Sequence, residues 1–293
     1  MIYRAGQTVL VQGITGKQGT FWAEKMIAAG TKLAGGVNPK RAGETHLGLP
    51  VFGSAVDAVR QVHCDIAVIF IPPGMARDAV FDAIEAGIGT IVVLTEHIPA
   101  RDVIDIHARL RDSTSRMIGP NTAGIVTPGE GFIGIMPGDN PNVFKPGHVG
   151  VISRSGSLGT LICLNLTRAG LGQSAFIGIG GDPMIGTTTR DALEALDRDE
   201  RTRAVALIGE IGGAMEEQAA EYARRMRKPI VSFIAGRSSP PGKKMGHAGA
   251  IVTEGGGSYE SKRRALESVG VRVVDTPNEL ATYLANLPAE QAA

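Results

Sequence analysis

The chain of 293 residues is long enough for two domains of ordinary size, each with its own hydrophobic core. Hydrophobic residues make up 43% of it and charged residues 20%, a balance typical of folded globular proteins and not of disordered ones. The formal net charge is +1, so no overall electrostatic field attracts nucleic acid or an acidic membrane surface. We therefore expect neither among its partners, and a bound anion must be held by local groups.

The N-terminal segment and the cysteines bear on the compartment. The opening MIYRAGQTVLVQG has neither the basic start nor the long apolar stretch of a signal peptide. No apolar window reaches the roughly 18 residues that a membrane span needs. Cys64 and Cys163 are the only cysteines, one in each half, so a disulfide framework is not expected. These features predict a cytoplasmic protein.

Short apolar runs alternate with amphipathic stretches, the pattern of βαβ units around a parallel sheet. In the first half this pattern predicts strands near Thr8–Gln12, Lys32–Val37, Ile66–Ile71, Thr90–Leu94 and Arg116–Ile118. Helices are expected to begin near Thr20, Ala55, Ala76 and Ala100.

The second half repeats the alternation after a segment, 127–147, that is rich in Gly, Pro and Asn and lacks clear periodicity. Strands are predicted near Val149–Ser153, Ser174–Ile179, Ala204–Ile208, Ile230–Ile234 and Val271–Val274. Helices are predicted near Leu158–Ala169, Thr188–Leu196, Met215–Met226, Tyr259–Val269 and Asn278–Leu287. We therefore expect an α/β protein with two doubly wound domains, over 1–126 and 148–293, with 127–147 connecting them.

A glycine-rich turn, Gly13-Ile-Thr-Gly16-Lys-Gln-Gly19-Thr20, follows the first predicted strand and opens the first helix. Glycines allow backbone N–H groups to approach a phosphate, and a helix N-terminus favours negative charge. The spacing differs from GxGxxG, and Lys17 is not followed by the Ser or Thr of a P-loop. By itself, such a turn fits phosphate binding and a plain strand–helix connection equally well.

The end of the second predicted strand narrows the choice of ligand. A site for NAD usually has Asp or Glu there to bind the ribose hydroxyls. Here Lys40 and Arg41 follow the strand, and no acid occurs before Glu44. This favours a ribose that carries an extra phosphate, as in CoA and NADP, although a basic pair of this kind is also common as solvated loop charge.

One of the six histidines, His247, has an unusual setting between Gly246 and Ala248-Gly249. Small neighbours of this kind form a sterically open loop. An imidazole nitrogen is a competent nucleophile near neutral pH, and covalent catalysis divides one difficult transfer into easier ones. A histidine in a glycine loop is suggestive of catalysis without establishing it.

Two other segments would serve a phosphorylated histidine. Ser155, Gly156 and Ser157 open a predicted helix, where backbone N–H groups could hold a phosphoryl group. Glu210 follows a predicted strand, and a carboxylate bonded to one imidazole nitrogen would leave the other nitrogen nucleophilic. A solvated loop acid is the alternative for Glu210.

Seven motifs, in this order, resemble the α subunit of succinyl-CoA synthetase along nearly the whole chain. They are Gln12-Gly-Ile-Thr-Gly-Lys-Gln-Gly-Thr20, Thr45-His-Leu-Gly-Leu-Pro-Val-Phe52, Ile118-Gly-Pro-Asn121, Ser153-Arg-Ser-Gly156, Gly178-Ile-Gly-Gly-Asp-Pro183, Gly209-Glu-Ile-Gly-Gly213 and Gly246-His-Ala-Gly-Ala-Ile251. The resemblance implies an N-terminal Rossmann-like domain that binds CoA and a flavodoxin-like domain that carries a phosphohistidine.

Site residues follow from the resemblance position by position. It implies that His247 is phosphorylated, that Glu210 is its carboxylate partner, and that the helix start at Ser155 and Gly156, with Ser157, holds the phosphate. CoA is expected to contact Thr15, Gly16, Lys17, Gln18, Arg41, Leu94, Thr95 and Glu96, where Arg41 replaces a family lysine.

The family mechanism implied by the resemblance requires a second chain. A nucleoside triphosphate with Mg²⁺, bound on an ATP-grasp β subunit, phosphorylates the histidine. The phosphoryl group then passes to a small carboxylic acid, and the CoA thiol attacks the acyl phosphate. The partner is thus expected to be a β subunit, in an αβ or α₂β₂ assembly, and no metal site is expected in this chain.

The sequence departs from the family around the acid substrate. Thr122-Ala123 stands where the family has Cys-Pro, and Thr160-Leu161 stands where it has Tyr-Glu. With Asn121, Thr122 and Thr160 are the candidate substrate residues, and the acid stays open among succinate, malate, sulfoacetate and similar short acids. An NADP-dependent oxidoreductase would leave the His247 loop without a role. A non-catalytic CoA-sensing module would be expected to have lost His247, Glu210 or the Ser155 turn.

Overall fold

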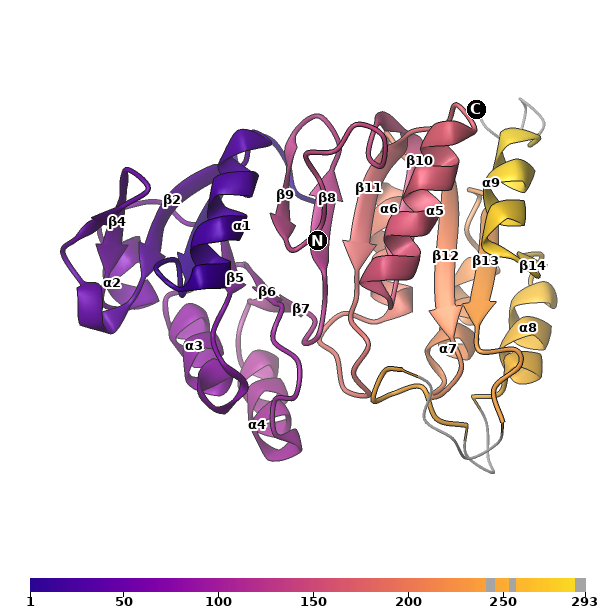
Figure 1. Ribbon diagram of the computed structural model, residues 1–293. Coiled ribbons are helices and arrows are strands. Elements are labelled where there is room, and N and C mark those ends of the chain that lie inside the picture. Colours follow the sequence, from indigo (N-terminus) through magenta and orange to yellow (C-terminus); the bar gives the residue numbers. More distant parts are fainter. Residues whose placement is uncertain (241–245, 253–256, 288–293) are drawn as a thin grey trace.

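Two seven-stranded sheets, each flanked by helices, make up the molecule in the computed structural model, which describes residues 1–240, 246–252 and 257–287 (Figure 1). The α/β fold class and the order of two doubly wound units are confirmed. None of the helices in these ranges is both long and apolar enough to cross a membrane.

The first sheet has the order β3-β4-β2-β1-β5-β6-β7, and all its neighbours are parallel except the β3–β4 pair. Its strands are β1 Thr8–Gln12, β2 Lys32–Val37, β3 Thr45–His46, β4 Leu49–Phe52, β5 Ile66–Ile69, β6 Thr90–Val93 and β7 Arg116–Ile118. Its helices are α1 Lys17–Ala28, α2 Ala55–Val59, α3 Pro73–Glu85 and α4 Ala100–Arg111, with a 3₁₀ turn at Pro39–Arg41.

The second sheet has the order β14-β13-β12-β10-β11-β8-β9, in which the first five strands are mutually parallel, β8 is antiparallel to β11, and β9 is antiparallel to β8. Its strands are β8 Gly124–Thr127, β9 Gly131–Gly134, β10 Pro146–Ser153, β11 Gln173–Gly178, β12 Ala204–Glu210, β13 Ile230–Ala235 and β14 Arg272–Val274. Its helices are α5 Gly156–Arg168, α6 Thr189–Arg198, α7 Met215–Ala223, α8 Tyr259–Glu267 and α9 Pro277–Ala285. Helices α5 and α9 pack together on one face, and α6, α7 and α8 form a row on the other (Figure 1).

Local sequence explains these elements. The central strands β1 and β12 are buried along their whole length, as expected of strands covered on both faces. Side-chain caps begin several helices: Ser155 caps α5, and Thr188 forms a capping box with Asp191 at α6. Each cap satisfies N–H groups that the first turn of a helix leaves free.

The segment 127–147 differs from the expected connection. Part of it, with residues just before it, forms the β8–β9 hairpin, which extends the second sheet beyond β11. Periodicity did not reveal these strands because they are short and contain glycines where backbones touch: a Cβ atom at Gly124 would lie 2.0 Å from the Ile133 carbonyl oxygen. Phe132 in β9 is fully buried, so this segment belongs to the protein core.

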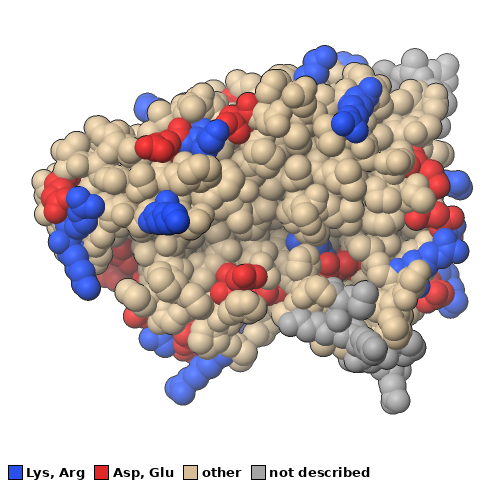
Figure 2. Space-filling model, viewed as in Figure 1, with Lys and Arg blue, Asp and Glu red and all other residues tan. Residues whose placement is uncertain are grey.

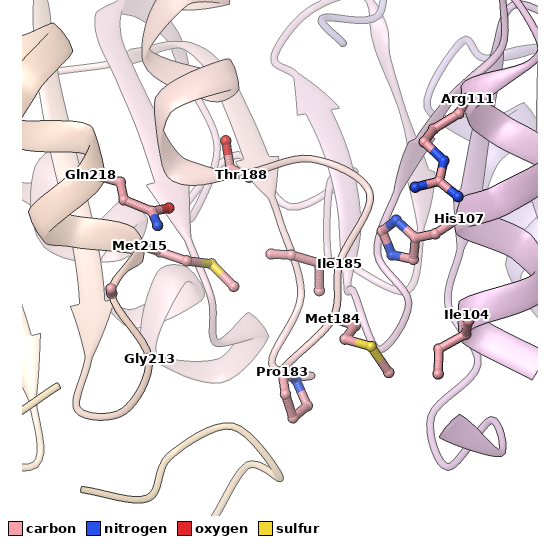
Figure 3. Close-up of a pocket in the computed structure, with 11 residues that line it drawn as sticks. Ile104, His107, Arg111, Pro183, Met184, Ile185, Thr188, Gly213, Met215 and Gln218 are labelled. Atoms are coloured by element: carbon pink, nitrogen blue, oxygen red, sulfur yellow. The ribbon is translucent and has the colours of Figure 1, made fainter. Parts of the chain in front are cut away.

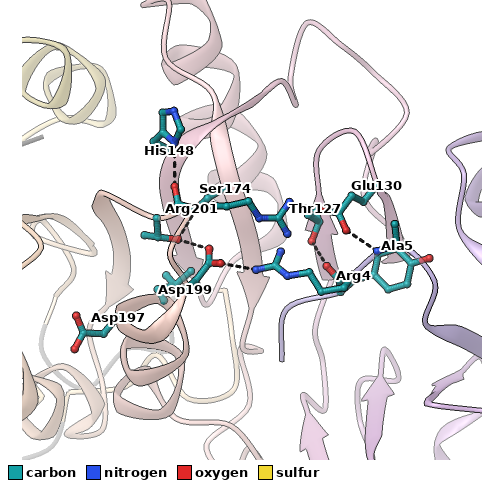
Figure 4. Close-up of polar contacts among 12 residues, drawn as sticks. Arg4, Ala5, Thr127, Glu130, His148, Ser174, Asp197, Asp199 and Arg201 are labelled. Carbon is teal, nitrogen blue, oxygen red and sulfur yellow. Dashed lines mark hydrogen bonds and ion pairs between the residues drawn. The ribbon is translucent and has the colours of Figure 1, made fainter. Parts of the chain in front are cut away.

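The two halves of the molecule share one hydrophobic core. The core of the second sheet runs on without a break to the α1 side of the first sheet, and Trp22 of α1 packs edge-on against Phe132, with ring centroids 6.3 Å apart. Polar contacts reinforce the junction (Figure 4): Arg4 pairs with Asp199 at 2.5 Å, and Thr127 Oγ1 donates to the Tyr3 carbonyl oxygen at 2.7 Å. The halves are therefore held as one packed body.

We expect Phe132→Ala to destabilise the junction. The substitution removes a fully buried aromatic side chain, which costs about 3–5 kcal/mol of unfolding free energy. Trp22 is the only tryptophan, so its fluorescence in a urea titration reports unfolding at this contact directly. Phe21→Ala is the matched control, because Phe21 also adjoins Trp22 but is 49% exposed. Equal losses of unfolding free energy in the two variants would contradict a shared core.

Candidate active site

The carboxyl ends of three neighbouring strands assemble the site in the second sheet. Ser153 at the end of β10 pairs in register with Gly178 of β11 on one side and Ile208 of β12 on the other. The chain leaves β10 towards β11 and then crosses back to β12, so the strand order reverses between β10 and β12. Such a switch point is where ligands bind in doubly wound sheets. Arg154 and Glu210 lie at this point.

His247, Glu210 and Arg154 form a partly buried row. His247 Nδ1 lies 2.7 Å from Glu210 Oε2, and Arg154 Nε lies 3.3 Å from Glu210 Oε1, at ion-pair distance without hydrogen-bond geometry. The Arg154 and Glu210 side chains are almost fully buried, whereas the His247 side chain is 28% exposed. The structure thus brings together the two residues that sequence reasoning paired, His247 and Glu210.

Glu210 determines the proton position on the imidazole. Its hydrogen bond is the main reason why the pKa of His247 is raised above the ordinary value of about 6.5; burial and the Arg154 charge oppose that rise. Because the carboxylate accepts from Nδ1–H, the neutral ring carries its lone pair on Nε2. The arrangement therefore suits nucleophilic attack by Nε2.

Glycines allow the His247 loop to lie close to the sheet edge. A Cβ atom at Gly181 would lie 2.5 Å from His247 Cγ, and one at Gly212 would lie 2.0 Å from the Gly249 carbonyl oxygen. The Gly249 N–H donates to Gly181 O at 3.3 Å, and Ala250 is buried. Of the loop around His247, residues 241–245 lie outside the described ranges.

The start of α5 lies beside this row. Ser155 caps the helix through the Leu158 N–H, Gly156 and Ser157 form its first turn, and Arg154 directly precedes them. Arg154 Nη1 is buried and has no hydrogen-bond partner among the described residues. A cationic donor next to a helix N-terminus is suited to an anion such as a phosphoryl group.

The candidate substrate residues have their polar groups engaged within the protein. Asn121 Nδ2 donates to Asp182 Oδ1 at 2.9 Å, and Thr122 Oγ1 donates to the Gly178 carbonyl oxygen. Thr160 Oγ1 donates to the Gly156 carbonyl oxygen at 2.8 Å. Leu161, next to Thr160, is 42% exposed.

A cavity of about 860 Å³ occupies the corresponding switch point of the first sheet, between β1 and β5. Four predicted residues of the glycine turn, Thr15–Gln18, line it together with Arg41. Close packing of the turn depends on Gly19, where a Cβ atom would lie 2.1 Å from the Gly13 carbonyl oxygen. Sequence reasoning missed Asn38, which lines the cavity and donates to Thr15 Oγ1 at 2.6 Å.

Leu94, Thr95 and Glu96, which were expected at the same site, do not line this cavity. Instead, Thr95 lies between the cavity and the second sheet: its hydroxyl donates to the Ile71 carbonyl oxygen at 2.7 Å, and its own carbonyl accepts from the Asn121 N–H at 2.9 Å. The end of β6 thus connects the wall of the cavity to Asn121.

Another cavity, of about 430 Å³, opens at the seam between the halves (Figure 3). Ile104, His107 and Arg111 of α4 face Met184 and Ile185 across it. None of the residues predicted for catalysis or binding lines this cavity. Among the described residues there is no group of three or more His, Cys, Asp or Glu side chains that could hold a metal ion.

Sequence reasoning gave no role to Arg154 or Asp182. In the sequence Arg154 is part of a loop motif, and only its burial and its contact with Glu210 in the structure reveal that its side chain turns into the protein. Asp182 joins Asn121 to the Arg154 side chain, which donates to the Asp182 carbonyl oxygen at 3.4 Å. The available signal was their position: Arg154 directly follows one predicted strand and Asp182 lies three residues after another, at strand ends where α/β sites gather.

Comparisons with known proteins identify the family of the chain. Residues 6–97 match the family described as "CoA binding domain", and residues 152–272 match "CoA-ligase". The chain is 49% identical over 279 residues to succinate–CoA ligase [ADP-forming] subunit alpha 2 of Archaeoglobus fulgidus, covering 95% of this chain and 96% of the relative. It is 43% identical to the corresponding α subunit of Staphylococcus aureus, covering 94% and 91%. The chain belongs to the family of succinate–CoA ligase α subunits.

Solved structures share the fold. ATP citrate lyase from Methanothrix soehngenii, in complex with citrate and coenzyme A, superposes with a TM-score of 0.89 at 23% identity. That match covers 99% of this chain but 51% of the lyase chain, so this chain spans about half of the lyase. A dinucleotide-forming acetyl-coenzyme A synthetase 1 from Ca. Korarchaeum cryptofilum gives a TM-score of 0.76 at 20% identity, covering 94% and 60%.

Glu210→Gln is expected to lower the pKa of His247, because the neutral amide stabilises imidazolium less while burial and Arg154 still disfavour it. A ¹⁵N NMR titration of the histidine side chains, assigned with a His247→Asn variant, measures the shift.

The direction of the His247 pKa shift also predicts how the stability of the protein depends on pH. A raised histidine pKa contributes stability that is present below the unfolded-state pKa and lost as pH rises through the folded-state pKa. The stability gap between wild type and variant should therefore narrow with rising pH, and a constant gap would contradict the pairing.

Proposed function

We propose that this chain is the CoA-binding, phosphohistidine-carrying α subunit of an ADP-forming succinate–CoA ligase. The observation that carries the proposal is the contact between Glu210 and Nδ1 of His247, which leaves Nε2 free to receive a phosphoryl group. Identities of 43–49% to α subunits of that name support it. The two cysteines offer no competing nucleophile, because both are buried and burial raises the pKa of each thiol.

Each group has a defined part in the transfer. His247 Nε2 takes the terminal phosphoryl group of a nucleoside triphosphate, and the nucleoside diphosphate leaves. Glu210 holds the proton on Nδ1 and stabilises the positive charge that develops on the ring. N–H groups of Ser155, Gly156 and Ser157 hold phosphoryl oxygens, and Arg154 adds positive charge.

Release of the phosphoryl group completes the cycle. A carboxylate oxygen of the acid attacks phosphorus, the P–Nε2 bond breaks, and His247 returns to its neutral form. CoA supplies the thiol that displaces phosphate from the acyl phosphate and forms the thioester. In this chain, Thr15, Gly16, Lys17, Gln18 and Arg41 hold the CoA nucleotide in the cavity of the first sheet, and the segment Leu94–Glu96 lines its path towards Asn121.

The triphosphate and its Mg²⁺ belong to an ATP-grasp β subunit, in an αβ or α₂β₂ assembly. Figure 2 shows that the middle of the face formed by α1, the β8–β9 hairpin and α5 carries few charged side chains. Three large apolar side chains on or beside these elements are exposed by 41–49%: Phe21, Ile135 and Leu161. An apolar face continuous with the start of α5 suits a partner that must reach His247. Two buried, unpaired cysteines fit a reducing cytoplasm.

A second candidate is the same chemistry on another short acid, such as malate or sulfoacetate. The observation that favours it is the pair Thr160-Leu161. The Thr160 hydroxyl donates its hydrogen bond to the Gly156 carbonyl oxygen. Leu161 exposes an apolar side chain at the position where the family has an acidic residue. Asn121, Thr122 and Thr160 are then the residues that select the acid.

Reversing the charge of Arg41 is expected to weaken CoA binding by about 1–3 kcal/mol, the usual range for a charge-assisted hydrogen bond. Isothermal titration of CoA into Arg41→Glu gives the loss. Lys40→Glu is the matched control, because it makes the same change one residue away and outside the cavity lining. If both substitutions weaken CoA binding equally, Arg41 acts only through the overall charge of this region and does not contact CoA.

The test of the function is thioester formation by this chain purified with its β subunit, with ATP, Mg²⁺, CoA and a panel of short acids. We expect ADP, phosphate and succinyl-CoA in equal amounts. A clear preference for malate or sulfoacetate would favour the second candidate. Thioester formation with none of the acids, by a complex that binds CoA, would contradict the ligase assignment.

A further inference from the structure

A buried ion pair lies behind the active site, between α7 and α8. Lys262 Nζ pairs with Glu216, and both side chains are completely buried. The same ammonium group donates to Glu217 Oε2 and to the Gly213 carbonyl oxygen, each at 3.0 Å, so all three of its donors are used. Apolar residues of similar volume often stabilise a fold as well as such a pair does. Fold stability alone therefore does not explain why this ion pair is present.

The pair fixes both ends of the turn that presents Glu210. Glu216 Oε1 accepts from the Glu210 N–H at 3.3 Å, and Lys262 holds the Gly213 carbonyl oxygen at the other end. Gly209 lies against the Glu216 carboxylate, since a Cβ atom there would come within 2.7 Å of Oε1. The turn needs external anchors because Gly212 and Gly213 both have positive φ, at 93° and 60°, and glycine backbones are easily displaced.

We propose that Glu216 and Lys262 are positioning residues for phosphohistidine formation, which hold the Glu210–Gly213 turn so that the Glu210 carboxylate meets Nδ1 of His247. The inference rests on the proposed function. Neither residue touches His247; both act through Glu210. A displacement of the turn also reaches the His247 loop, because Gly212 packs against the Gly249 carbonyl oxygen.

The charges around His247 define what a displaced turn would change. Glu210 and Asp182 raise the pKa of His247, whereas Arg154 and burial lower it. If Glu210 moves away while Arg154 stays, the pKa of His247 falls and the ring loses its orientation. A purely structural role for Lys262 would lower stability without moving this pKa in the folded protein.

The test compares the wild-type complex, formed with its β subunit, with a Glu216→Met/Lys262→Met variant, which removes both fully buried charges together. Glu217 loses its contact with Lys262 but is 21% exposed and still accepts from the Ser261 hydroxyl. Two quantities are measured: the rate of His247 phosphorylation by ATP, and the pKa of His247 by ¹⁵N NMR on the chain alone. Lys228→Met is the matched control, because Lys228 also donates to three carbonyl oxygens, those of Leu196, Asp197 and Asp199, at the end of α6.

We expect the double variant to phosphorylate on the order of 100-fold more slowly, the usual penalty for a reacting group misplaced by about 1 Å. Its His247 pKa should fall, while Lys228→Met changes neither quantity. Unchanged rate and pKa in a folded double variant, or an equal change in Lys228→Met, would overturn the inference. Should the double variant not fold, Glu216→Gln/Lys262→Met carries the same test, because it loses the Gly213 anchor but keeps an acceptor for Glu210 N–H.

Failure of the proposed function is distinguishable from failure of this inference. A wild-type complex that does not phosphorylate His247 contradicts the proposed function. The His247 pKa in the chain alone, compared between wild type and double variant, still tests the positioning.

Discussion

The site is organised around one carboxylate, that of Glu210, which is buried between a guanidinium and an imidazole. Burying a carboxylate is costly unless opposite charge and hydrogen bonds compensate for it. Arg154 supplies the charge on one side, and Nδ1 of His247 supplies a hydrogen-bond donor on the other. The same contact sets the tautomer of His247 and its raised pKa. The glycines at positions 181, 212 and 249 follow from it, because the histidine loop must lie against the sheet edge for the contact to form.

A second constraint is the shared core, which fixes the cavity of the first sheet relative to the Glu210–His247 pair of the second. The cavity of about 860 Å³ and the Glu210–His247 pair each lie at the switch point of a different sheet. Because the sheets share one hydrophobic core, the separation of these points is a property of a single packed body. Thr95, hydrogen-bonded to Ile71 on one side and Asn121 on the other, lies along the connection.

Sequence patterns predicted the parallel cores of both sheets well. Strands β1, β2 and β7 have the bounds expected from their apolar runs, because a strand buried on both faces is continuous in hydrophobicity. Helix α1 begins at Lys17 instead of near Thr20, because Gly16 is its N-cap and Gly19, the last glycine of the turn, lies in its first turn. The β8–β9 hairpin was not found, since its pairing depends on glycine contacts that leave no periodic signal.

The candidate site shows a similar division. Residues that follow a strand or open a helix, such as Glu210 and Ser155, were recognisable from local sequence. Arg154, Asp182, Glu216 and Lys262 were not, because their significance lies in contacts across the fold and in burial. A buried lysine cannot be distinguished from a surface lysine by composition, and α8, which carries Lys262, reads as an ordinary amphipathic helix.

The central claim is that Glu210 directs phosphorylation to one nitrogen of His247. The most direct test is ³¹P–¹⁵N NMR of the chain with ¹⁵N-labelled histidine, phosphorylated in its αβ complex with ATP and Mg²⁺ and kept at alkaline pH. The account predicts a single acid-labile phosphoryl group on Nε2 of His247, with Nδ1–H still hydrogen-bonded to Glu210. A phosphoryl group on Nδ1, or on any other residue, would contradict it.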